Sequence, residues 1–373
     1  MIYLDYSATT PANKEVVDVF SKVSLEYIGN PNSLHKLGIE SKKLMDAATS
    51  QVASLLGVNP SEVIFTSGAS ESNNLAICGV LGKYSGRGKQ IITTKLEHSS
   101  ILECVSYLEK IGYKVDYVNV LENGLVDLKD LERLVSKDTV LVSIHHVNSE
   151  IGFCQNVEEI GQLLSNYPTT IFHVDGTQAL GKIPVSLKNI DLYSFSSHKF
   201  YGLKGCGGLI KKEKIELEPM IHGGKSQSIY RSGTPALPLI VSSSKALRLA
   251  LDNLDKNYSL VSNLSIYLKE SLKKINGIIL NNNENCIPHI VNISVPSIKP
   301  ETLLHALEEY EIYISTKTAC SKDSSNSLTL MALGKDDSIS GHSIRISISH
   351  LTTKEEIDIF IEKLKYCIEK LSF

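Results

Sequence analysis

Between residues 60 and 210, short apolar runs of strand length alternate with stretches in which apolar residues follow helical spacing. The strand-like runs are Glu62–Thr66, Gln90–Thr94, Tyr113–Val120, Thr139–Val147, Thr170–Val174 and Asp191–Ser196. The intervening segments are a small-residue turn at 67–70 with a helix to about Tyr84, a capping-box sequence at Ser100–Glu103, a helical stretch at Asn156–Tyr167, and a helix or turn at Gln178–Lys182. This alternation predicts an α/β fold with a mostly parallel sheet. Ligands of such sheets bind at the carboxyl ends of the strands.

The pattern changes after about residue 235. Leu239–Lys274 is expected to form a long helical linker, followed by a strand near His289–Val295, a helix near Glu301–Glu309 and a strand at Ser343–Ser349. A second capping box at Thr353–Glu356 opens the last helix, whose apolar positions predict one buried face. Ser315–Ser327 contains almost no apolar side chains, which predicts an exposed, mobile loop.

Composition narrows the function classes. The chain has 373 residues and a net charge of -3, so it lacks the basic excess of a nucleic-acid binder. No apolar run is long enough for a membrane helix, and the N-terminal residues do not resemble a signal peptide, so we expect a cytoplasmic protein. The seven scattered cysteines include no CxxC pair, which favours reduced thiols over disulfides or a zinc site.

Four features follow predicted strands. Ser67–Ser70 precedes a helix and suits an anion, although an ordinary capped helix explains it as well. His98 follows the second strand, where a structural histidine is the simpler alternative. Asp175 closes a strand three residues before Gln178, either for a ligand or as a helix cap. Lys199 follows Ser196 and His198 and could form a Schiff base, although most lysines are solvated surface residues.

Together, the four features change the balance between these alternatives. An aspartate can hold a pyridinium nitrogen protonated, a lysine can bind an aldehyde, and a helix start made of small residues can hold a phosphate. These are the protein groups that a pyridoxal 5′-phosphate (PLP) site needs. The four features together therefore favour a PLP site over four unrelated structural roles.

At this point the chain resembles the cysteine desulfurases of the class V aminotransferase group. The matching stretches run in order along nearly the whole chain, from YLDYSATTP at 3–11 through GNPNSLH at 29–35, FTSGASESNNLAI at 65–77, HVNSEIG at 146–152, HVDGTQ at 173–178, SFSSHK at 194–199, HGG at 222–224 and RSGT at 231–234 to SIRIS at 343–347. The resemblance implies fold type I of the PLP-dependent enzymes. A large domain at 12–238 would carry a mostly parallel seven-stranded sheet, and residues 1–11 and 239–373 would form a smaller α+β domain with a nucleophile loop at 315–327.

The same resemblance implies roles for individual residues. Lys199 would hold the cofactor covalently and move protons, and His98 would stack on its ring and act as an acid/base. Asp175 would pair with the ring nitrogen, and Gln178 and Ser149 would contact the phenolic oxygen. The phosphate would be held by Ala69, Ser70, Ser196 and His198, and by Thr234 reaching across a homodimer. Arg345 would bind the carboxylate of L-cysteine, and Cys320 would be the nucleophile.

The implied activity is conversion of L-cysteine to L-alanine, with a persulfide on Cys320 that passes to an acceptor protein in iron–sulfur assembly or tRNA thiolation. Selenocysteine lyase, another C–S lyase, an aminotransferase, or a scaffold without turnover are alternatives. No resident metal is expected, although Cys320 could ligate an iron–sulfur cluster in a complex. Ser149 replaces the usual Asn and residues 225–228 depart from the usual motif, which suggests a divergent member.

Overall fold

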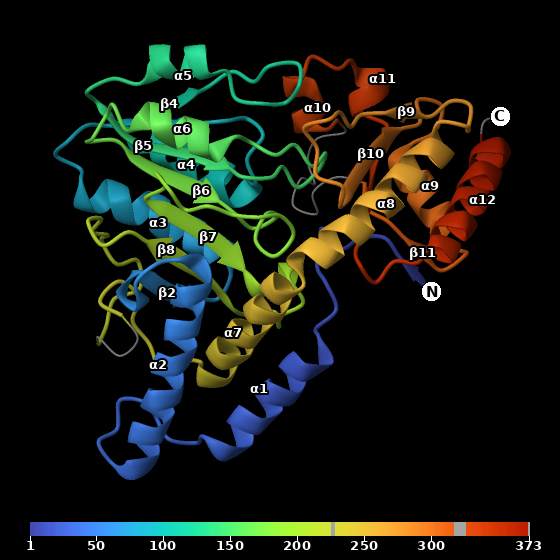
Figure 1. Ribbon diagram of the computed structural model, residues 1–373. Coiled ribbons are helices and arrows are strands. Elements are labelled where there is room, and N and C mark those ends of the chain that lie inside the picture. The colour runs from blue at the N-terminus through green and yellow to red at the C-terminus, as the bar shows by residue number, and fades with distance from the viewer. Residues whose placement is uncertain (225–227, 317–325, 372–373) are drawn as a thin grey trace.

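The computed structural model describes residues 1–224, 228–316 and 326–371 (Figure 1). Its largest sheet has the strand order β2-β8-β7-β6-β5-β3-β4. These strands are β2 (Val63–Thr66), β3 (Gln90–Thr93), β4 (Lys114–Tyr117), β5 (Thr139–His145), β6 (Ile171–Asp175), β7 (Leu192–Ser196) and β8 (Gly207–Lys211). β8 runs antiparallel to both of its neighbours, and the other pairs are parallel. The predicted α/β fold with a mostly parallel seven-stranded sheet is confirmed.

Alternation along the strands gives this sheet two buried faces. Ile92, Val142 and Phe172 pack on one face, and their chain neighbours Ile91, Leu141 and Ile171 pack on the other. The first face is covered by α1 (Lys14–Glu26), α2 (Lys36–Leu56), α5 (Leu128–Leu134), α6 (Val157–Leu164) and α7 (Leu237–Asp252). The second face is covered by α3 (Ala69–Lys83) and α4 (Ser99–Lys110). Because helices cover both faces of the sheet, a ligand can approach the sheet only at the ends of its strands.

A second apolar core lies beside this body (Figure 1). It forms around an antiparallel sheet of β9 (Ile279–Leu280), β10 (Ile290–Ser294) and β12 (Ser343–Ser347), and around β1 (Ile2–Tyr3) paired with β11 (Ile312–Tyr313). The helices of this part are α8 (Leu254–Leu272), α9 (Pro300–Glu308), α10 (Leu328–Ala332), α11 (Asp337–Ser340) and α12 (Lys354–Leu371). Leu4 from the N-terminal segment is fully buried in this core, so the chain's first residues pack with its last ones.

The packing of α7 and α8 indicates where the part around the large sheet ends and the part around the second core begins. Ile240 and Leu247 of α7 belong to the core of the large sheet, whereas Val261 and Leu268 of α8 belong to the second core. We therefore propose a boundary at Asn253, between α7 and α8, in place of residue 238. None of the helices in the described ranges is long and apolar enough to cross a membrane.

Two local predictions were wrong. The helix expected to open at the Ser100 capping box begins at Ser99, and its N-cap is His98, whose ring Nδ1 accepts the Ser100 N–H at 3.1 Å. An imidazole nitrogen replaced the expected hydroxyl as the acceptor. The expected long linker helix is two helices, because α7 ends and α8 begins at Asn253. The second capping box is confirmed, since Thr353 and Glu356 exchange both of its hydrogen bonds.

Candidate active site

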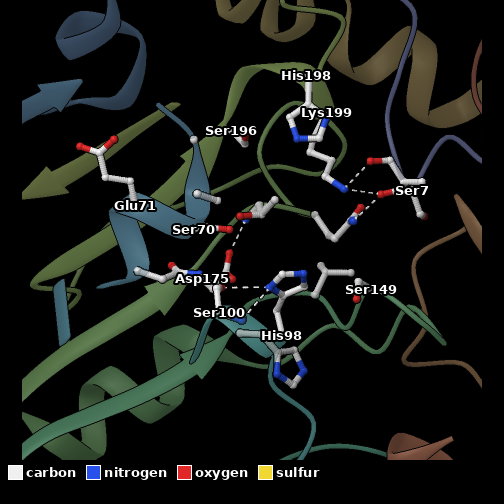
Figure 2. A pocket seen from close by; sticks show the side chains of 18 of the residues that line it. Ser7, Ser70, Glu71, His98, Ser100, Ser149, Asp175, Ser196, His198 and Lys199 are labelled. Carbon is white, nitrogen blue, oxygen red and sulfur yellow. Dashed lines mark hydrogen bonds between the residues drawn. The ribbon is translucent and has the colours of Figure 1, made fainter. Parts of the chain in front are cut away.

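A cavity of about 470 Å³ lies at the carboxyl ends of the central strands. Most of the predicted site residues line it: Ala69, Ser70, His98, Ser149, Asp175, Gln178, Ser196, His198, Lys199 and Arg345. Figure 2 labels seven of these residues, among them Ser70 of α3 and Asp175 and Lys199 at the strand ends, and shows them around one cavity with Ser7 of the N-terminal segment. The four features that follow predicted strands in the sequence are thus brought into one place.

Lys199 ends a short 3-10 turn that directly follows β7. Its Nζ donates to the backbone carbonyl oxygens of Ser7 at 2.5 Å and Ala8 at 2.8 Å (Figure 2). The N-terminal segment therefore crosses the cavity and holds the amine by two backbone acceptors. The resemblance pointed to this segment as part of a motif, but local spacing gave no sign that it touches Lys199.

Asp175 is the last residue of β6 and is 6% exposed. One oxygen accepts the Asn73 side-chain N–H at 2.8 Å, and the other accepts the Thr177 backbone N–H at 3.0 Å. Asn73 also donates to the Ser100 hydroxyl at 2.9 Å, and that hydroxyl lies 3.0 Å from His98 Nδ1. One hydrogen-bonded chain thus orients the carboxylate and the imidazole together.

The imidazole rings of His98 and His198 in the cavity are both neutral, because each pKa is lowered. Burial is the main cause that lowers the pKa of His98, and the Asp175 carboxylate offsets only part of this effect. Burial, followed by the charges of Lys199 and Lys204, lowers the pKa of His198 to about 4. Since His98 Nδ1 accepts the Ser100 N–H, the proton of its neutral ring belongs on Nε2. Both rings are therefore uncharged near pH 7.

The other end of the cavity is built around the start of α3. Gly68 is the N-cap with φ 155°, and the N–H groups of Ala69 and Ser70 belong to the first turn, which leaves its donors without helical partners. A Cβ at residue 68 would stand 3.5 Å from the Ser196 hydroxyl, and a Cβ at Gly207 of β8 would meet the Cα of Gly68 at 2.7 Å. The positive φ favours glycine at residue 68, and the close approach of Gly68 leaves no room for a Cβ at residue 207. The helix start therefore lies directly against the strand ends, where its free N–H groups can bind an anion.

Arg345 reaches the same cavity from β12, in the other sheet. Its side chain is 3% exposed; Nη1 donates to the Ser149 carbonyl at 2.9 Å, and Nη2 lies 2.8 Å from the Asp5 carboxylate. The buried Nε has no hydrogen-bond partner. A buried guanidinium with an unused donor beside a cavity is suited to a carboxylate ligand.

Lys182 was missed by the sequence analysis. It is almost fully buried, and its Nζ donates to Gln178 Oε1 at 2.5 Å, while Gln178 Nε2 donates to the Ser7 carbonyl at 2.9 Å. Burial, then the charges of Lys199 and Arg345, hold the pKa of Lys182 well below its usual range. These two contacts orient the Gln178 amide so that its NH₂ group faces the N-terminal segment. A lysine after a turn carried no signal of such burial.

Among the predicted site residues that the structure describes, Thr234 does not line this cavity. Thr234 is exposed on the segment after Arg231, and Arg231 is paired with Glu71 of α3 at 2.9 Å. Although burial alone would raise it, the hydrogen bonds from Arg231 and Ser67 lower the pKa of Glu71. Cys320 lies outside the described residues, as does most of the predicted nucleophile loop at 315–327.

The donor set fits PLP. The cavity combines a lysine amine, a carboxylate, a neutral imidazole and a helix start with free N–H groups, and these match its aldehyde, ring nitrogen, ring face and phosphate in turn. Lys204 adds positive charge to a cavity that would hold a negatively charged phosphate. The described residues of one chain therefore include a chemically suitable partner for each of these four parts of the cofactor.

Comparison with known proteins agrees with the geometry. The aminotransferase class-V family matches residues 2–360. A cysteine desulfurase, IscS, of Buchnera aphidicola subsp. Baizongia pistaciae is 40% identical over 99% of this chain and 93% of its own length. A solved NifS-like protein is 38% identical, with a TM-score of 0.94 over 99% of this chain and 100% of its own. The solved structure titled "SspA in complex with cysteine" is 29% identical, with a TM-score of 0.83 over 95% of this chain and 100% of its own. The chain belongs to the class-V aminotransferase family of PLP-dependent enzymes.

Proposed function

We propose that this protein is a cysteine desulfurase that converts L-cysteine to L-alanine and leaves the sulfur as a persulfide on Cys320. The observation that carries the proposal is the convergence of Lys199, Asp175, His98 and Arg345 on one cavity. Relatives named cysteine desulfurase and a relative solved with cysteine support the choice of substrate.

Each residue has a defined task in holding the cofactor and the substrate. PLP, when bound, supplies an electron-withdrawing ring that makes the α-proton of an attached amino acid acidic. Lys199 Nζ is the amine that holds the aldehyde, and Asp175 faces the ring nitrogen. Ala69, Ser70, Ser196 and His198 would hold the phosphate, and Gln178 and Ser149 would contact the phenolic oxygen. Arg345 binds the substrate carboxylate through its guanidinium.

The proton movements belong to Lys199 and His98. Once displaced by substrate, the Lys199 amine is free to accept the α-proton and return it. The neutral His98 ring presents an Nε2–H that can protonate a developing charge on the substrate. The Ser7 and Ala8 carbonyls then offer the amine a fixed resting position on the cavity wall.

Sulfur transfer completes the reaction. The Cys320 thiolate attacks the sulfur of cysteine, the Cβ–S bond breaks, and its electron pair stays on the β-carbon, which takes up a proton to give alanine. The sum is one enzyme thiol and one L-cysteine converted to one enzyme persulfide and one L-alanine. We further propose a homodimer, in which Thr234 completes the partner's phosphate site, and a cytoplasmic acceptor protein for iron–sulfur assembly or tRNA thiolation.

The test is alanine production from L-cysteine by the parent and by Cys320→Ser. Because serine supplies no thiolate at neutral pH, the variant should bind PLP normally but lose at least 100-fold in rate. Mass spectrometry of the parent should find the extra sulfur on Cys320, and Cys206→Ser is the matched control that should keep both. Full activity in Cys320→Ser would favour a lyase that needs no protein nucleophile.

A further inference from the structure

Two cysteines outside the cavity lie in contact. Cys78 of α3 and Cys104 of α4 have their sulfur atoms 3.5 Å apart, although 26 residues separate them in the chain. Neither residue lines the cavity. The sulfur of Cys206, by contrast, contacts a backbone oxygen, since it lies 3.9 Å from the Gly207 carbonyl oxygen.

The helices that carry this pair are already tied together. Asn73 donates to the Ser100 hydroxyl at 2.9 Å, and Asn74 donates to the Ser100 carbonyl at 3.3 Å. A disulfide needs an S–S distance of about 2.05 Å, so the two sulfur atoms must approach by roughly 1.5 Å.

The two thiols differ in access. Cys104 is buried among the apolar residues between α3, α4 and the sheet, and is 7% exposed, whereas Cys78 is only partly buried at the edge of that cluster. Within this chain Cys78 is therefore the more accessible of the two residues, and Cys104 lies deeper in the apolar cluster. This arrangement is that of an attacking thiol with a resolving partner.

We propose that Cys78 and Cys104 form a thiol–disulfide modification site that closes in the folded enzyme, with Cys78 attacking and Cys104 resolving. The Cys78 thiolate attacks a low-molecular-weight disulfide RSSR, forms a mixed disulfide and releases RS⁻. The Cys104 sulfur, losing its proton, then displaces the second RS⁻. The pair loses two electrons, and RSSR takes them up to give two RSH. The hydrogen bond from Cys104, which outweighs burial, lowers the pKa of Cys78, and the same contact raises that of Cys104.

Closure would join the two helices that begin at the cofactor site. α3 starts at the phosphate cradle, and α4 starts at His98. Because these helix starts are already tied through Ser100, we expect the disulfide to preserve the cavity and to stabilise the α3–α4 pair. The modification thus acts on a different pair of thiols from the sulfur transfer proposed for Cys320.

The experiment treats native holoenzyme with oxidised glutathione, blocks free thiols and maps the peptides by mass spectrometry. The parent should give a linked Cys78–Cys104 peptide that is two hydrogens lighter, and a melting temperature about 2–5 °C higher that dithiothreitol reverses. Cys104→Ser should trap glutathione on Cys78, and Cys78→Ser should leave Cys104 unmodified. Cys206→Ser should behave as the parent.

Three outcomes would overturn the proposal. The first is a native parent that gives no linked peptide. The second is linkage that appears only after denaturant is added. The third is trapping of glutathione on Cys104 in Cys78→Ser at the rate seen on Cys78 in Cys104→Ser. The peptide map of the parent alone shows whether the disulfide forms in the native protein. The test therefore holds even if a variant fails to fold.

Discussion

The two sides of the cavity are built in different ways. The cofactor side comes from the ends of neighbouring strands in one core, where Asp175 closes β6 and Lys199 follows β7. The substrate side depends on Arg345, which comes from a second sheet and meets Asp5 across 340 residues of chain. The first side is positioned by sheet register, and the second by the docking of two cores.

The N-terminal segment joins these two sides. The Ser7 carbonyl accepts from both Lys199 and Gln178, while the Ser7 N–H donates to the Ser347 hydroxyl of β12 at 2.9 Å. A shift between the cores would therefore act on the amine and on the guanidinium at once. The comparison teaches that Asp175 is positioned within one core, whereas the Lys199 amine and the Arg345 guanidinium both depend on how the two cores pack together.

Lys199→Ala should have the largest effect, because it removes the only amine held at the cavity by the Ser7 and Ala8 carbonyls among the residues that the structure describes. We expect activity to fall by about 10³-fold or more and covalently attached cofactor to be lost. Borohydride reduction followed by peptide mapping measures the attachment. Lys204→Ala, which removes another lysine of the same cavity, should keep the label on Lys199. Label on any other lysine in the parent would contradict the assignment.

Arg345→Ala should separate the two sides. Losing a charge-assisted pair costs roughly 1.5–3 kcal/mol, so the KM for cysteine should rise at least tenfold while cofactor content stays normal. Steady-state kinetics and cofactor absorbance give the two readouts. Arg345→Lys keeps the charge without the fork and should fall between the parent and alanine. An unchanged KM would remove Arg345 from the substrate site.

Lys182→Met should affect the cofactor side indirectly, through Gln178. The change leaves Gln178 Oε1 buried without its donor, at a cost of about 1–3 kcal/mol. We expect cofactor affinity to fall by about tenfold, with a shift of the cofactor absorbance band and little change in the KM for cysteine. Lys188→Met, on the same segment but exposed, is the control. A loss confined to thermal stability would reduce Lys182 to a packing role.

Asp5→Asn should have the smallest effect and sharpen the comparison further. The amide keeps an acceptor for Arg345 Nη2 but removes a carboxylate that competes with substrate for the same guanidinium. The KM for cysteine should fall about two- to threefold at low salt, with kcat unchanged. Asp18→Asn, exposed on α1, should leave both constants as they are. A higher KM in Asp5→Asn would show that Asp5 mainly positions the guanidinium.

The local sequence pattern predicted much of the fold and some of the candidate site residues. Strand-length runs followed by polar residues located β6 with Asp175 and β7 with Lys199, because strand ends in a parallel sheet share one edge. β8 was not predicted, since Gly207 and Gly208 dilute the apolar signal of a short strand. His98 was found as a candidate residue, but its role as the cap of α4 was assigned to Ser100 because hydroxyls are the usual acceptors.

Sequence alone located six of the seven strands of the large sheet and the buried face of the last helix, and through the family resemblance it named candidate site residues. Only the tertiary structure decided that Asp5 pairs with Arg345, that Lys182 is buried against Gln178, and that Cys78 meets Cys104. The physical reason is range. Periodicity and capping depend on neighbours within a few residues, whereas these contacts arise where separate helices, sheets and cores are packed together.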